Sequence, residues 1–423
     1  MVGSFVLEGP IRLSGSVKIS GAKNAALPVL AAIPLVKGET VLHNVPRLED
    51  VFTMIQILES LGISSRWDGN TLILKNNGLR TNEVPYELVR KMRASFNVLG
   101  PVTVSAGEAR VPQPGGCAIG VRPVNFHIEA LKTLGFDLEV NHGVVEAKIG
   151  RVSEGEVKTV SFPQPSVGAT EHTMTTAAAM EGVEVTITNA AQEPEIVDLQ
   201  NFLNMCGAKI EGAGTSTLLV KGVKTLSGCE YTIMNDRIEA GTYLIAGAAT
   251  GGNVVVEDVE PEHLKALLDA FERAGVPHEV GDTWIRVIPG GEYRPIHLEV
   301  QPYPGFPTDL QPQITAMFST VRGVSVIREH VFRNRFHHVP ELNRMGASIS
   351  VEDGTAVIEG VDKLLGAPVE ATDLRAAAAL VIAGLMAEGK TIISRIEHIF
   401  RGYENVLEKF RALGAQIDYL VDE

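Results

Sequence analysis

The sequence has few cysteines and no long apolar segment. Only three cysteines, Cys117, Cys206 and Cys229, occur in 423 residues, and their odd number and wide spacing are unlike a disulfide framework or the close pairs of a zinc site. No run approaches the roughly 20 consecutive apolar residues that a membrane-spanning helix needs. The N-terminus also lacks the basic and hydrophobic segments of a secretion signal. These absences predict a cytoplasmic protein without membrane insertion.

Basic residues are outnumbered as well. The chain has 37 Lys and Arg against 51 Asp and Glu, a formal net charge of -14, which disfavours nucleic-acid binding because that needs a basic surface to displace counterions from phosphates. Walker, Rossmann, GxSxG and HExxH motifs are all missing, which argues against nucleotide hydrolysis, dinucleotide redox chemistry and zinc proteolysis. We therefore expect no nucleic-acid partner, no metal and no cofactor. Any anionic substrate must be held by a local basic cluster.

An internal repeat is the main long-range feature of the sequence. A helix-like segment that ends in glycine and is followed by a strand-like run occurs six times, and successive glycines are 68 to 73 residues apart. A glycine just past a helix can adopt the left-handed conformation that closes the last turn. Six such glycines at near-constant spacing indicate six copies of one unit. The glycines are Gly62, Gly135, Gly207, Gly275, Gly346 and Gly414.

Each unit also contains an earlier Ala-rich or apolar helix, so the pattern is helix, strand, helix and strands. Six α/β units of about 70 residues without a Pro/Ser-rich linker predict two halves of three units each. The weakest seam lies near residues 229–236, and an N-terminal strand at about residues 4–19 could pair with the last unit. We therefore expect one domain at residues 22–232, and a second domain at residues 1–21 plus 233–423.

Basic residues stand at helix starts, where they oppose the positive end of the helix dipole. Lys23 and Asn24 directly precede the first apolar helix, and Arg375 lies in the first turn of another. Helix N-termini bind anions readily because their first amides have no partner within the helix. These residues are thus candidates for anion binding. For any one of them, a side chain that simply reaches solvent is the ordinary alternative.

Cys117 lies in a glycine-rich loop. Gly115, Gly116 and Gly120 surround it, and Arg122 follows five residues later. The glycines give the backbone freedom to move, and a nearby arginine lowers the pKa of a thiol. The pattern indicates a mobile lid that carries an ionisable cysteine. The alternative is a small buried hydrophobe, which is the usual fate of a free cysteine and the interpretation we give to Cys206 and Cys229.

Two further segments carry charged side chains without a clear chemistry of their own. Asp309 stands at the start of a helix in the fifth unit, where an acidic residue needs no functional explanation. Residues 328–344 contain four arginines and three histidines. The adjacent histidines do not face one another on a helix, and no acidic or cysteine partner stands at ligand spacing, so we interpret this segment as an arginine-bearing loop.

Nine motifs taken together resemble the UDP-N-acetylglucosamine 1-carboxyvinyltransferases of the enolpyruvyl transferase family, in order from residue 21 to about residue 404. The motifs are SGAKNAALPVLAA, MRAS, PGGCAIGVRPVNFHI, PSVGAT, EPEIVD, GFPTDLQPQ, NRFHHVPELNRMGA, ATDLRAA and RGYE. The resemblance implies a two-domain inside-out α/β barrel with three βαβαββ repeats per domain, helices inside and sheets outside. It also implies transfer of the enolpyruvyl group of phosphoenolpyruvate to the 3-hydroxyl of UDP-N-acetylglucosamine, with release of phosphate, as the first committed step of peptidoglycan synthesis.

The resemblance also implies the roles of individual residues. Cys117 is the proton donor and can form a covalent adduct with phosphoenolpyruvate, while Asp309 takes the proton of the sugar hydroxyl. The phosphate is held by Lys23, Arg122 and Arg401. The carboxylate is held by Arg335 and Arg375. Asn24 and Asp373 line the reacting centre. The UDP-sugar contacts are expected from Arg93, Arg122, Pro123, Val124, Asn125, Phe126, Gln164, Ser166, Val167, Gly168, Asp309 and Val331.

Some residues differ from the pattern common in that family. Asn125 stands where aspartate is frequent, Gln164 where a basic residue often lies, and Gln192 where arginine is frequent. These differences leave the reacting groups intact and concern contacts to uridine and diphosphate. The nearest rival is the sister enzyme that acts on shikimate 3-phosphate, which lacks a Cys117 lid. A repeat-built DNA clamp is a second alternative, but it would need a basic inner surface. We expect a monomer.

Overall fold

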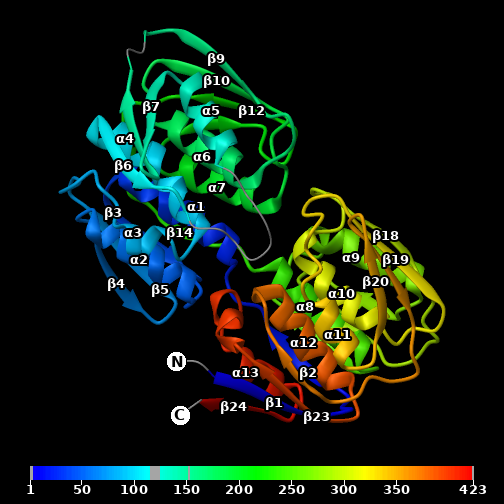
Figure 1. The fold of residues 1–423 in the computed structure, drawn as a ribbon. Helices are drawn as coiled ribbons and strands as arrows, with labels where there is room; N and C mark the ends of the chain where they lie inside the picture. The colour runs from blue at the N-terminus through cyan, green and yellow to red at the C-terminus, as the bar shows by residue number, and fades with distance from the viewer. Residues whose placement is uncertain (1–2, 115–123, 151–152, 422–423) are drawn as a thin grey trace. The chain divides into compact units, whose positions relative to one another are not determined.

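The chain forms two compact units. The computed structural model describes residues 3–114, 124–150 and 153–421. The described residues between 21 and 234 make up one unit, called here the N-terminal unit, and residues 3–20 together with 235–421 make up the other, the C-terminal unit (Figure 1). Each unit contains three β-sheets packed around helices.

The N-terminal unit contains the first three repeats. Its helices are α1 (Lys23–Ala32), α2 (Glu49–Ser60), α3 (Tyr86–Val89), α4 (Leu99–Ala106), α5 (Asn125–Thr133), α6 (Val167–Ala178) and α7 (Pro194–Met205). Its strands are β3 (Val36–His43), β4 (Ser64–Asp68), β5 (Thr71–Asn76), β6 (Glu108–Pro112), β7 (Phe136–Asn141), β8 (Val144–Ile149), β9 (Glu156–Ser161), β10 (Val183–Thr188), β11 (Lys209–Glu211), β12 (Thr217–Lys221), β13 (Leu226–Ser227) and β14 (Glu230–Thr232).

The C-terminal unit contains the other three repeats. Its helices are α8 (Arg237–Ala249), α9 (Lys265–Ala274), α10 (Gln311–Phe318), α11 (Val339–Arg344), α12 (Leu374–Met386) and α13 (Val406–Ala412). Its strands are β1 (Gly3–Gly9), β2 (Ser14–Lys18), β15 (Asn253–Glu257), β16 (His278–Val280), β17 (Trp284–Val287), β18 (His297–Val300), β19 (Val324–Glu329), β20 (Ser348–Glu352), β21 (Thr355–Glu359), β22 (Pro368–Glu370), β23 (Gly389–Ser394) and β24 (Ile417–Val421).

The repeats share one strand order. In the fifth repeat the order is β18-β19-β21-β20, with β18 and β19 parallel and the other pairs antiparallel. The third repeat has the same arrangement, because β9 and β10 are parallel and β12 lies between β10 and β11. In the second repeat a single parallel bridge between Glu83 and Arg110 stands in place of the first strand. The predicted fold class, an α/β protein of βαβαββ repeats, is confirmed.

The N-terminal segment adds strands to the sheets of later repeats, and the sequence predicted only one of these pairings. Strand β1 pairs with β23 and β24, so the predicted pairing of the N-terminal segment with the last repeat is confirmed for β1. The expectation of one strand over residues 4–19 is wrong, because β2 is a separate strand that pairs with β15 of the fourth repeat. Pro10 lies between the two strands, and proline has no amide hydrogen for a sheet. At the other end of the N-terminal unit, β13 and β14 run parallel to β3.

All six glycines that defined the repeat have a positive φ angle, between 76° and 105°. A side chain is strained in this left-handed region, whereas glycine is not. Each glycine follows the second helix of its repeat, namely α2, α5, α7, α9, α11 or α13, and lets the chain turn directly into a strand. The internal repeat predicted from the spacing therefore corresponds to a physical requirement at each helix end.

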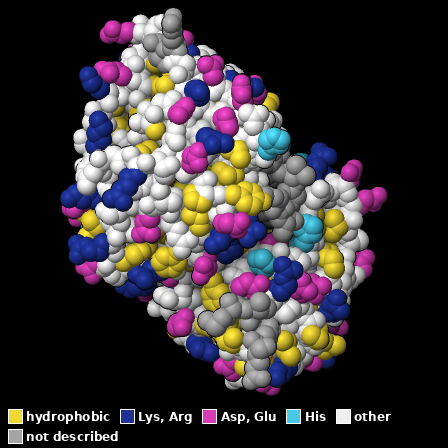
Figure 2. Space-filling view, turned by 60° about the vertical axis from the view of Figure 1, so that its left-hand side comes forward, with side chains coloured by type: hydrophobic (Ala, Val, Ile, Leu, Met, Phe, Trp, Pro, Cys, Tyr) yellow, Lys and Arg dark blue, Asp and Glu magenta, His cyan; other side chains and the backbone are white. Residues whose placement is uncertain are grey.

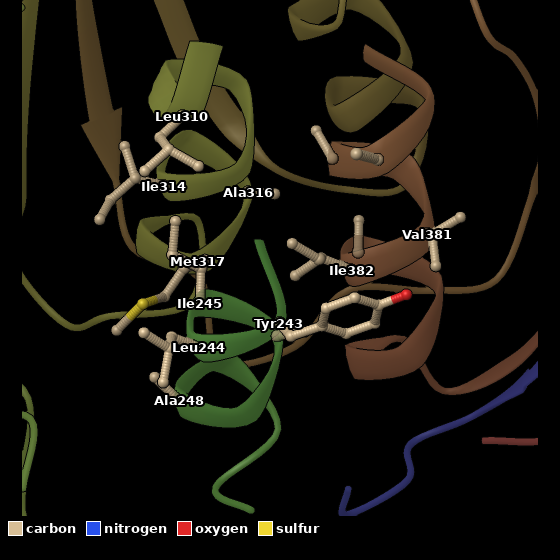
Figure 3. Packing of buried hydrophobic residues seen from close by; sticks show 14 of the residues in the cluster. Tyr243, Leu244, Ile245, Ala248, Leu310, Ile314, Ala316, Met317, Val381 and Ile382 are labelled. Carbon is tan, nitrogen blue, oxygen red and sulfur yellow. The ribbon is translucent and has the colours of Figure 1, made fainter. Parts of the chain in front are cut away.

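The first helix of each repeat is the buried one. In the C-terminal unit α8, α10 and α12 pack on one another, and every residue of α12 from Arg375 to Leu385 is buried. Close packing depends on small residues: a Cβ on Gly241 of α8 would lie 2.6 Å from Leu310. Figure 3 shows side chains of this core. They include Tyr243, Leu244, Ile245, Leu310, Ile314, Met317, Val381 and Ile382.

The exposed surface carries charges of both signs. On the face shown in Figure 2, Lys and Arg side chains are interspersed with Asp and Glu and do not form a continuous basic stripe. Among the described residues, no helix has the length and apolar character needed to cross a bilayer.

Candidate active site

The predicted site residues fall into three sets. Cys117, Arg122 and Pro123 lie outside the described residues. The C-terminal unit carries Asp309, Val331, Arg335, Asp373, Arg375 and Arg401, and the N-terminal unit carries Lys23, Asn24, Arg93, Val124, Asn125, Phe126, Gln164, Ser166, Val167 and Gly168. The two described sets are treated separately below.

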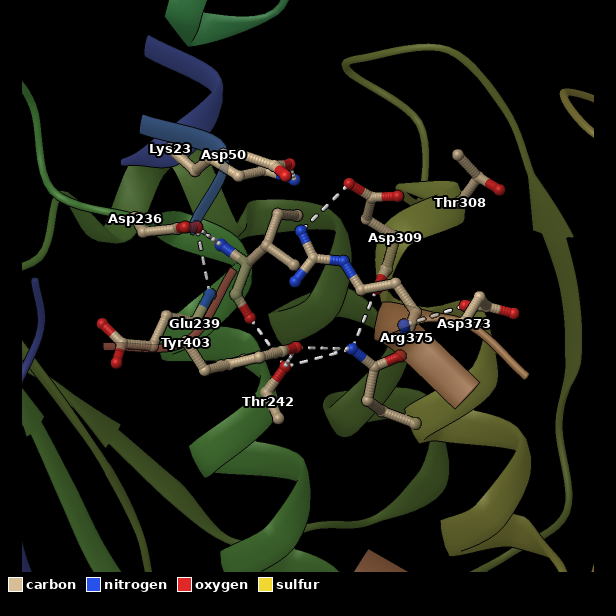
Figure 4. Close-up of polar contacts among 12 residues, drawn as sticks. Lys23, Asp50, Asp236, Glu239, Thr242, Thr308, Asp309, Asp373, Arg375 and Tyr403 are labelled. Atoms are coloured by element: carbon tan, nitrogen blue, oxygen red, sulfur yellow. Dashed lines mark hydrogen bonds and ion pairs between the residues drawn. The ribbon is translucent and has the colours of Figure 1, made fainter. Parts of the chain in front are cut away.

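Asp309 is the centre of the set in the C-terminal unit. Its Oδ1 accepts a hydrogen bond from Nη1 of Arg335 at 2.6 Å, and its Oδ2 accepts one from Nη2 of Arg375 at 3.2 Å. Figure 4 shows Arg375 and Asp309 turned toward each other. Asp309 lies in the first turn of the short helix η4 (Thr308–Leu310), as expected, but its carboxylate is held by two arginines, so its position at a helix start is not the whole explanation of this residue.

Burial makes this cluster unusual. The side chains of Arg335 and Arg375 are 3% and 2% exposed, whereas that of Asp309 is 25% exposed. A buried guanidinium is costly unless its donors are satisfied. Nε of Arg335 and Nη1 of Arg375 have no hydrogen-bond partner among the described residues. Two buried cations beside one partly exposed carboxylate leave a net positive charge at this place in the C-terminal unit, which favours an anion nearby.

The start of α12 holds Arg375 in place. Oδ1 of Asp373 accepts hydrogen bonds from the backbone amides of Arg375 at 2.9 Å and Ala376 at 3.1 Å, which is the geometry of a helix N-cap. The guanidinium of Arg375 lies over the ring of Tyr403, 5.3 Å from its centroid. Burial alone would lower the pKa of Arg375, but Tyr403 and Asp309 raise it above its ordinary value. Arg375 thus remains charged, and its interpretation as a surface side chain is wrong.

A second acidic residue, which was not among the predicted site residues, supports the cluster. Glu329, at the end of β19, is 1% exposed, and its Oε1 accepts hydrogen bonds from the amides of Val331 at 2.8 Å and Phe332 at 3.0 Å. Its Oε2 accepts a bond from the hydroxyl of Thr308, to which Arg335 donates. Burial raises the pKa of Glu329. A carboxylate at the end of an apolar strand was the only sequence signal for this role.

Arg401 ends the short helix η5 (Ile396–Arg401), which packs on α12. Its side chain is partly exposed. Burial lowers the pKa of the neighbouring His398, on which the charges of Arg401 and Asp373 also act. Arg401 therefore lies in the electrostatic surroundings of the start of α12, as a site role would require.

The arginine-bearing segment contributes only one of its four arginines to this cluster. Arg335 is buried, whereas Arg328, Arg333 and Arg344 are exposed. Of its two adjacent histidines, His338 is 2% exposed and His337 is exposed. Burial lowers the pKa of His338 to about 3. The expectation of an arginine-bearing loop holds only for the middle of the segment, because Arg328 lies in β19 and Arg344 in α11. The sequence also could not separate buried from solvated side chains.

Lys23 is the first residue of α1 in the N-terminal unit. Its Nζ lies 3.2 Å from Oδ2 of Asp50 in the first turn of α2, and the two side chains are 13% and 6% exposed. The N-cap residue, Ala22, provides no side-chain hydrogen bond to the helix. Lys23 is therefore not a solvated side chain. It places a nearly buried ammonium group at an uncapped helix start, next to the partly buried Asn24.

Most of the residues predicted to contact the UDP-sugar lie at the starts of two further helices. Ser166 is the N-cap of α6 but forms no side-chain hydrogen bond to it, and Val167 and Gly168 form its first turn. Val124 is the N-cap of α5, which begins with Asn125 and Phe126. Of the predicted residues here, Asn125 and Gln164 are exposed.

Arg93 begins the short helix η2 (Arg93–Val98), and its charge acts on His127 of α5. His127 is 4% exposed, one residue after Phe126 in the first turn and a half of α5. The sequence analysis did not select it. A histidine in a helix without a ligand-like neighbour gives no signal from spacing alone.

Two cysteines that are distant in the sequence meet in the structure. The Sγ atoms of Cys206 and Cys229 are 3.4 Å apart. Cys206 is 3% exposed and Cys229 is half-buried, so the interpretation as a buried small residue holds for Cys206. The hydrogen bond and burial raise the pKa of Cys206, and the same bond lowers that of Cys229. The wide sequence spacing concealed this contact.

Comparison with known proteins places this arrangement in a family. The sequence model described as EPSP synthase (3-phosphoshikimate 1-carboxyvinyltransferase) matches residues 7–410. The chain also resembles the crystal structure of the enolpyruvyl transferase NikO from Streptomyces tendae, with a TM-score of 0.90 and 24% identity over 100% of both chains. An EPSP synthase structure from Acinetobacter baumannii has a TM-score of 0.76 and 17% identity, again over 100% of both. The chain belongs to the enolpyruvyl transferase family.

Within that family, sequence identity singles out one group of relatives. A protein of Thermotoga petrophila named UDP-N-acetylglucosamine 1-carboxyvinyltransferase is 55% identical over 100% of this chain and 98% of its own length. A protein of the same name from Kosmotoga olearia is 52% identical over 100% of both. The resemblance predicted from the nine motifs is thus confirmed over the whole chain.

Proposed function

We propose that this protein transfers the enolpyruvyl group of phosphoenolpyruvate to the 3-hydroxyl of UDP-N-acetylglucosamine and releases phosphate. The observation that carries the proposal is the Asp309 carboxylate held by two buried arginines, whose two positive charges exceed its single negative charge. The relatives with 50–55% identity that bear this enzyme's name support the same choice of substrates. The reaction would be the first committed step of peptidoglycan synthesis, and through it the protein would serve cell-wall growth, cell shape and division from the cytoplasm.

The reaction is an addition followed by an elimination. The methylene carbon of phosphoenolpyruvate gains a proton while the 3-oxygen of the sugar bonds to C2, and the sugar hydroxyl loses its proton. The methyl carbon then returns a proton as the C2–O bond to phosphate breaks, which leaves the enolpyruvyl ether and phosphate. Each step needs a positioned acid or base. We assign Cys117 as the proton donor, able to add covalently to phosphoenolpyruvate, and Asp309 as the base for the hydroxyl.

Anion binding is assigned to the basic residues. Arg335 and Arg375, whose two positive charges exceed the single negative charge of Asp309, would bind the carboxylate of phosphoenolpyruvate. Lys23, Arg122 and Arg401 would bind the phosphate, and Lys23 would do so at the uncapped start of α1. Fixed positive groups in a water-poor site stabilise the charge that develops on the leaving phosphate. Asn24 and Asp373 would line the reacting centre.

The UDP-sugar is assigned to the helix starts of the N-terminal unit. The uncapped first turn of α6 offers free amides to an anion such as a diphosphate. Val331 of the C-terminal unit, whose amide is fixed by Glu329, would add a contact from the loop after β19. The assigned residues of the N-terminal unit are Arg93, Arg122, Pro123, Val124, Asn125, Phe126, Gln164, Ser166, Val167 and Gly168. We propose that the two compact units are the two domains of the enzyme, with residues 22–232 in one, and that it is a monomer.

Phosphate release tests the proposal. Pure protein is mixed with phosphoenolpyruvate and either UDP-N-acetylglucosamine or shikimate 3-phosphate, and inorganic phosphate is measured over time. We expect release with the UDP-sugar alone. Release with shikimate 3-phosphate alone would show that the protein has the activity of the sister enzyme. No release with either acceptor would refute the proposal.

Cys117 can be tested with fosfomycin, an epoxide that resembles phosphoenolpyruvate. We expect fosfomycin to alkylate Cys117, Cys117→Ala to abolish turnover at neutral pH, and Cys117→Asp to keep turnover and escape the drug. A carboxyl can donate a proton but is a poor nucleophile toward an epoxide. Mass spectrometry that found the label on Cys206 or Cys229 would contradict the role of Cys117.

A further inference from the structure

Two buried histidines face each other in the N-terminal unit. Nδ1 of His127 on α5 lies 3.1 Å from Nδ1 of His172 on α6. The residues are 4% and 1% exposed, and the ring of Phe96 meets both imidazoles edge-on at centroid distances of 5.6 and 6.1 Å. Packing on this scale fixes the orientation of both rings.

A third contact determines which ring nitrogens carry protons. The backbone amide of Gly100 donates a hydrogen bond to Nε2 of His172 at 2.8 Å. Nε2 of His172 is therefore an acceptor, and a neutral His172 carries its proton on Nδ1. That proton can only be donated to Nδ1 of His127, so a neutral His127 carries its own proton on Nε2.

Both rings are neutral at physiological pH. Burial lowers the pKa of His172 to about 3. Burial, His172 and Arg93 together lower the pKa of His127 well below its ordinary value. A proton on both Nδ1 atoms would place two donors face to face, so the contact itself also excludes a charged His127. The chain of hydrogen bonds is thus polarised in one direction, from Gly100 through His172 to His127.

The free end of this chain points to the start of α6. A Cβ on Gly168 would lie 3.3 Å from Cε1 and 3.4 Å from Nε2 of His127, so the ring edge with the donor lies against the first turn of α6. Nε2 has no hydrogen-bond partner among the described residues. The N-cap residue Ser166 leaves the amides of that turn without a side-chain acceptor, and the charge of Arg93 is close by. Nε2 of His127 is not among the fully buried polar atoms that lack a partner, so this donor, the uncapped amides and the cation can together favour one anion.

We propose that the Nε2–H group of His127 donates a hydrogen bond to a diphosphate oxygen of the UDP-sugar, and that His172 is the positioning residue that fixes His127 in this tautomer. The inference rests on the proposed function for the identity of the ligand. The tautomer part concerns the protein alone, because it follows from contacts between Gly100, His172 and His127. Without His172, the proton of His127 would be free to move to Nδ1, and Nε2 would then repel a phosphate oxygen.

Two amide substitutions of His172 separate its two hydrogen bonds. The side-chain amide of asparagine reaches the place of Nδ1, so His172→Asn keeps a donor to His127 and loses the acceptor for Gly100. The amide of glutamine reaches the place of Nε2, so His172→Gln keeps that acceptor and loses the donor. We expect His172→Asn to bind UDP-N-acetylglucosamine within about threefold of the wild type and His172→Gln about tenfold more weakly, with the KM for phosphoenolpyruvate unchanged in both.

The tautomer is read directly from the full-length protein by nitrogen NMR of ¹⁵N-labelled histidine, with His127→Gln used to assign the signals. We expect the proton of His127 on Nε2 in the wild type and in His172→Asn, and on Nδ1 or exchanging in His172→Gln. A wild-type proton on Nδ1, or equal binding losses in both His172 variants, would overturn the proposal. If the wild type did not bind UDP-N-acetylglucosamine, the proposed function would fail, while the spectra would still decide the tautomer.

Discussion

Two buried helices of the C-terminal unit begin differently from two of the N-terminal unit, whereas α10, the third buried helix of the C-terminal unit, has no side-chain cap at Leu310. In the C-terminal unit, Asp236 caps α8 and Asp373 caps α12, each with two hydrogen bonds from backbone amides. In the N-terminal unit, the N-cap residues Ala22 of α1 and Ser166 of α6 form no such bonds. A capped start is satisfied by the protein and can hold a charged side chain such as Arg375 in one position. An uncapped start keeps its amides for an external anion.

The two units thus differ in the role we assign to them: the C-terminal unit holds charged side chains in place, and the N-terminal unit offers hydrogen-bond donors to a ligand. The C-terminal unit presents prearranged charges, with Asp309 fixed between Arg335 and Arg375. The N-terminal unit presents helix starts with unfilled hydrogen-bonding capacity next to Lys23 and Arg93. Four groups of substitutions test this contrast.

The largest effect is expected at the fixed carboxylate. Asp309→Asn retains the shape of the side chain but removes the proposed base, so kcat should fall by about 10²- to 10⁴-fold. The dissociation constant of UDP-N-acetylglucosamine, measured by calorimetry, should change by less than about tenfold. Asp418→Asn is the matched control, because Asp418 also pairs with an arginine but is 79% exposed. A kcat for Asp309→Asn within threefold of the control would remove Asp309 from the mechanism.

Opposite pH dependence is expected from one buried group in each unit. Burial raises the pKa of Glu239 in α8 to about 7, although Lys409 lies 2.6 Å away and acts against this shift. An acid whose pKa is raised on folding contributes stability that is present below its ordinary pKa of about 4.5 and lost as pH rises through about 7. For His172 the pKa falls to about 3, so its contribution is present above about 6.5 and lost as pH falls.

Hydrogen exchange in the two units, measured across pH, separates these contributions. In the wild type, the stability of α8 should fall by at most about 3 kcal/mol as pH rises from about 4.5 to 7. In Glu239→Gln this fall should be absent. His172→Asn should remove a fall in the stability of α6 below about pH 6.5. Unchanged pH profiles in both variants would show that neither group is shifted as its burial implies.

Adding a cap to an uncapped start should trade binding for stability. Ser166→Asp places a carboxylate at the N-cap of α6, where its interaction with the helix dipole stabilises the helix by about 0.5 kcal/mol or more. The same carboxylate occupies the first amides of the helix and repels a diphosphate. We expect about tenfold weaker binding of UDP-N-acetylglucosamine together with an equal or higher Tm, whereas Ser166→Ala, which loses only the hydroxyl contact assigned above, should weaken binding by about threefold or less. Undiminished binding in Ser166→Asp would place the diphosphate elsewhere.

Removing a cap should have the smallest effect on activity, together with a modest loss of stability. Asp373→Ala and Asp236→Ala should each lower the free energy of unfolding by about 1 kcal/mol, as measured in urea. Asp373→Ala should in addition raise the KM for phosphoenolpyruvate several-fold, because Arg375 loses its fixed backbone. Equal KM values in the wild type and Asp373→Ala would mean that the cap serves the helix alone.

The sequence predicted the repeats well, because each of the six glycines meets a local requirement of its own helix end. The strands at the chain ends were harder to predict. Strand pairing is long-range, and only Pro10 hinted that β1 and β2 are separate. The charges at helix starts, Lys23 and Arg375, were also visible locally. That both are nearly buried depends on packing, which a one-dimensional pattern does not contain.

Residues whose function depends on partners distant in the chain were missed for the same reason. Glu329 acts by holding the amide of Val331 and the hydroxyl of Thr308, and His172 by holding His127 45 residues away. Neither belongs to a motif with a spacing of its own. Asp309 was found, but only the structure shows that its carboxylate pairs with Arg335 and Arg375.

The identity of the product tests the central claim most directly. The protein is incubated with ¹³C-labelled phosphoenolpyruvate and UDP-N-acetylglucosamine, and the purified product is examined by NMR. We predict one equivalent of phosphate and an enolpyruvyl ether whose labelled carbon is joined to the 3-oxygen of the glucosamine ring. Phosphate without a new ether, or an ether on another oxygen, would contradict the account.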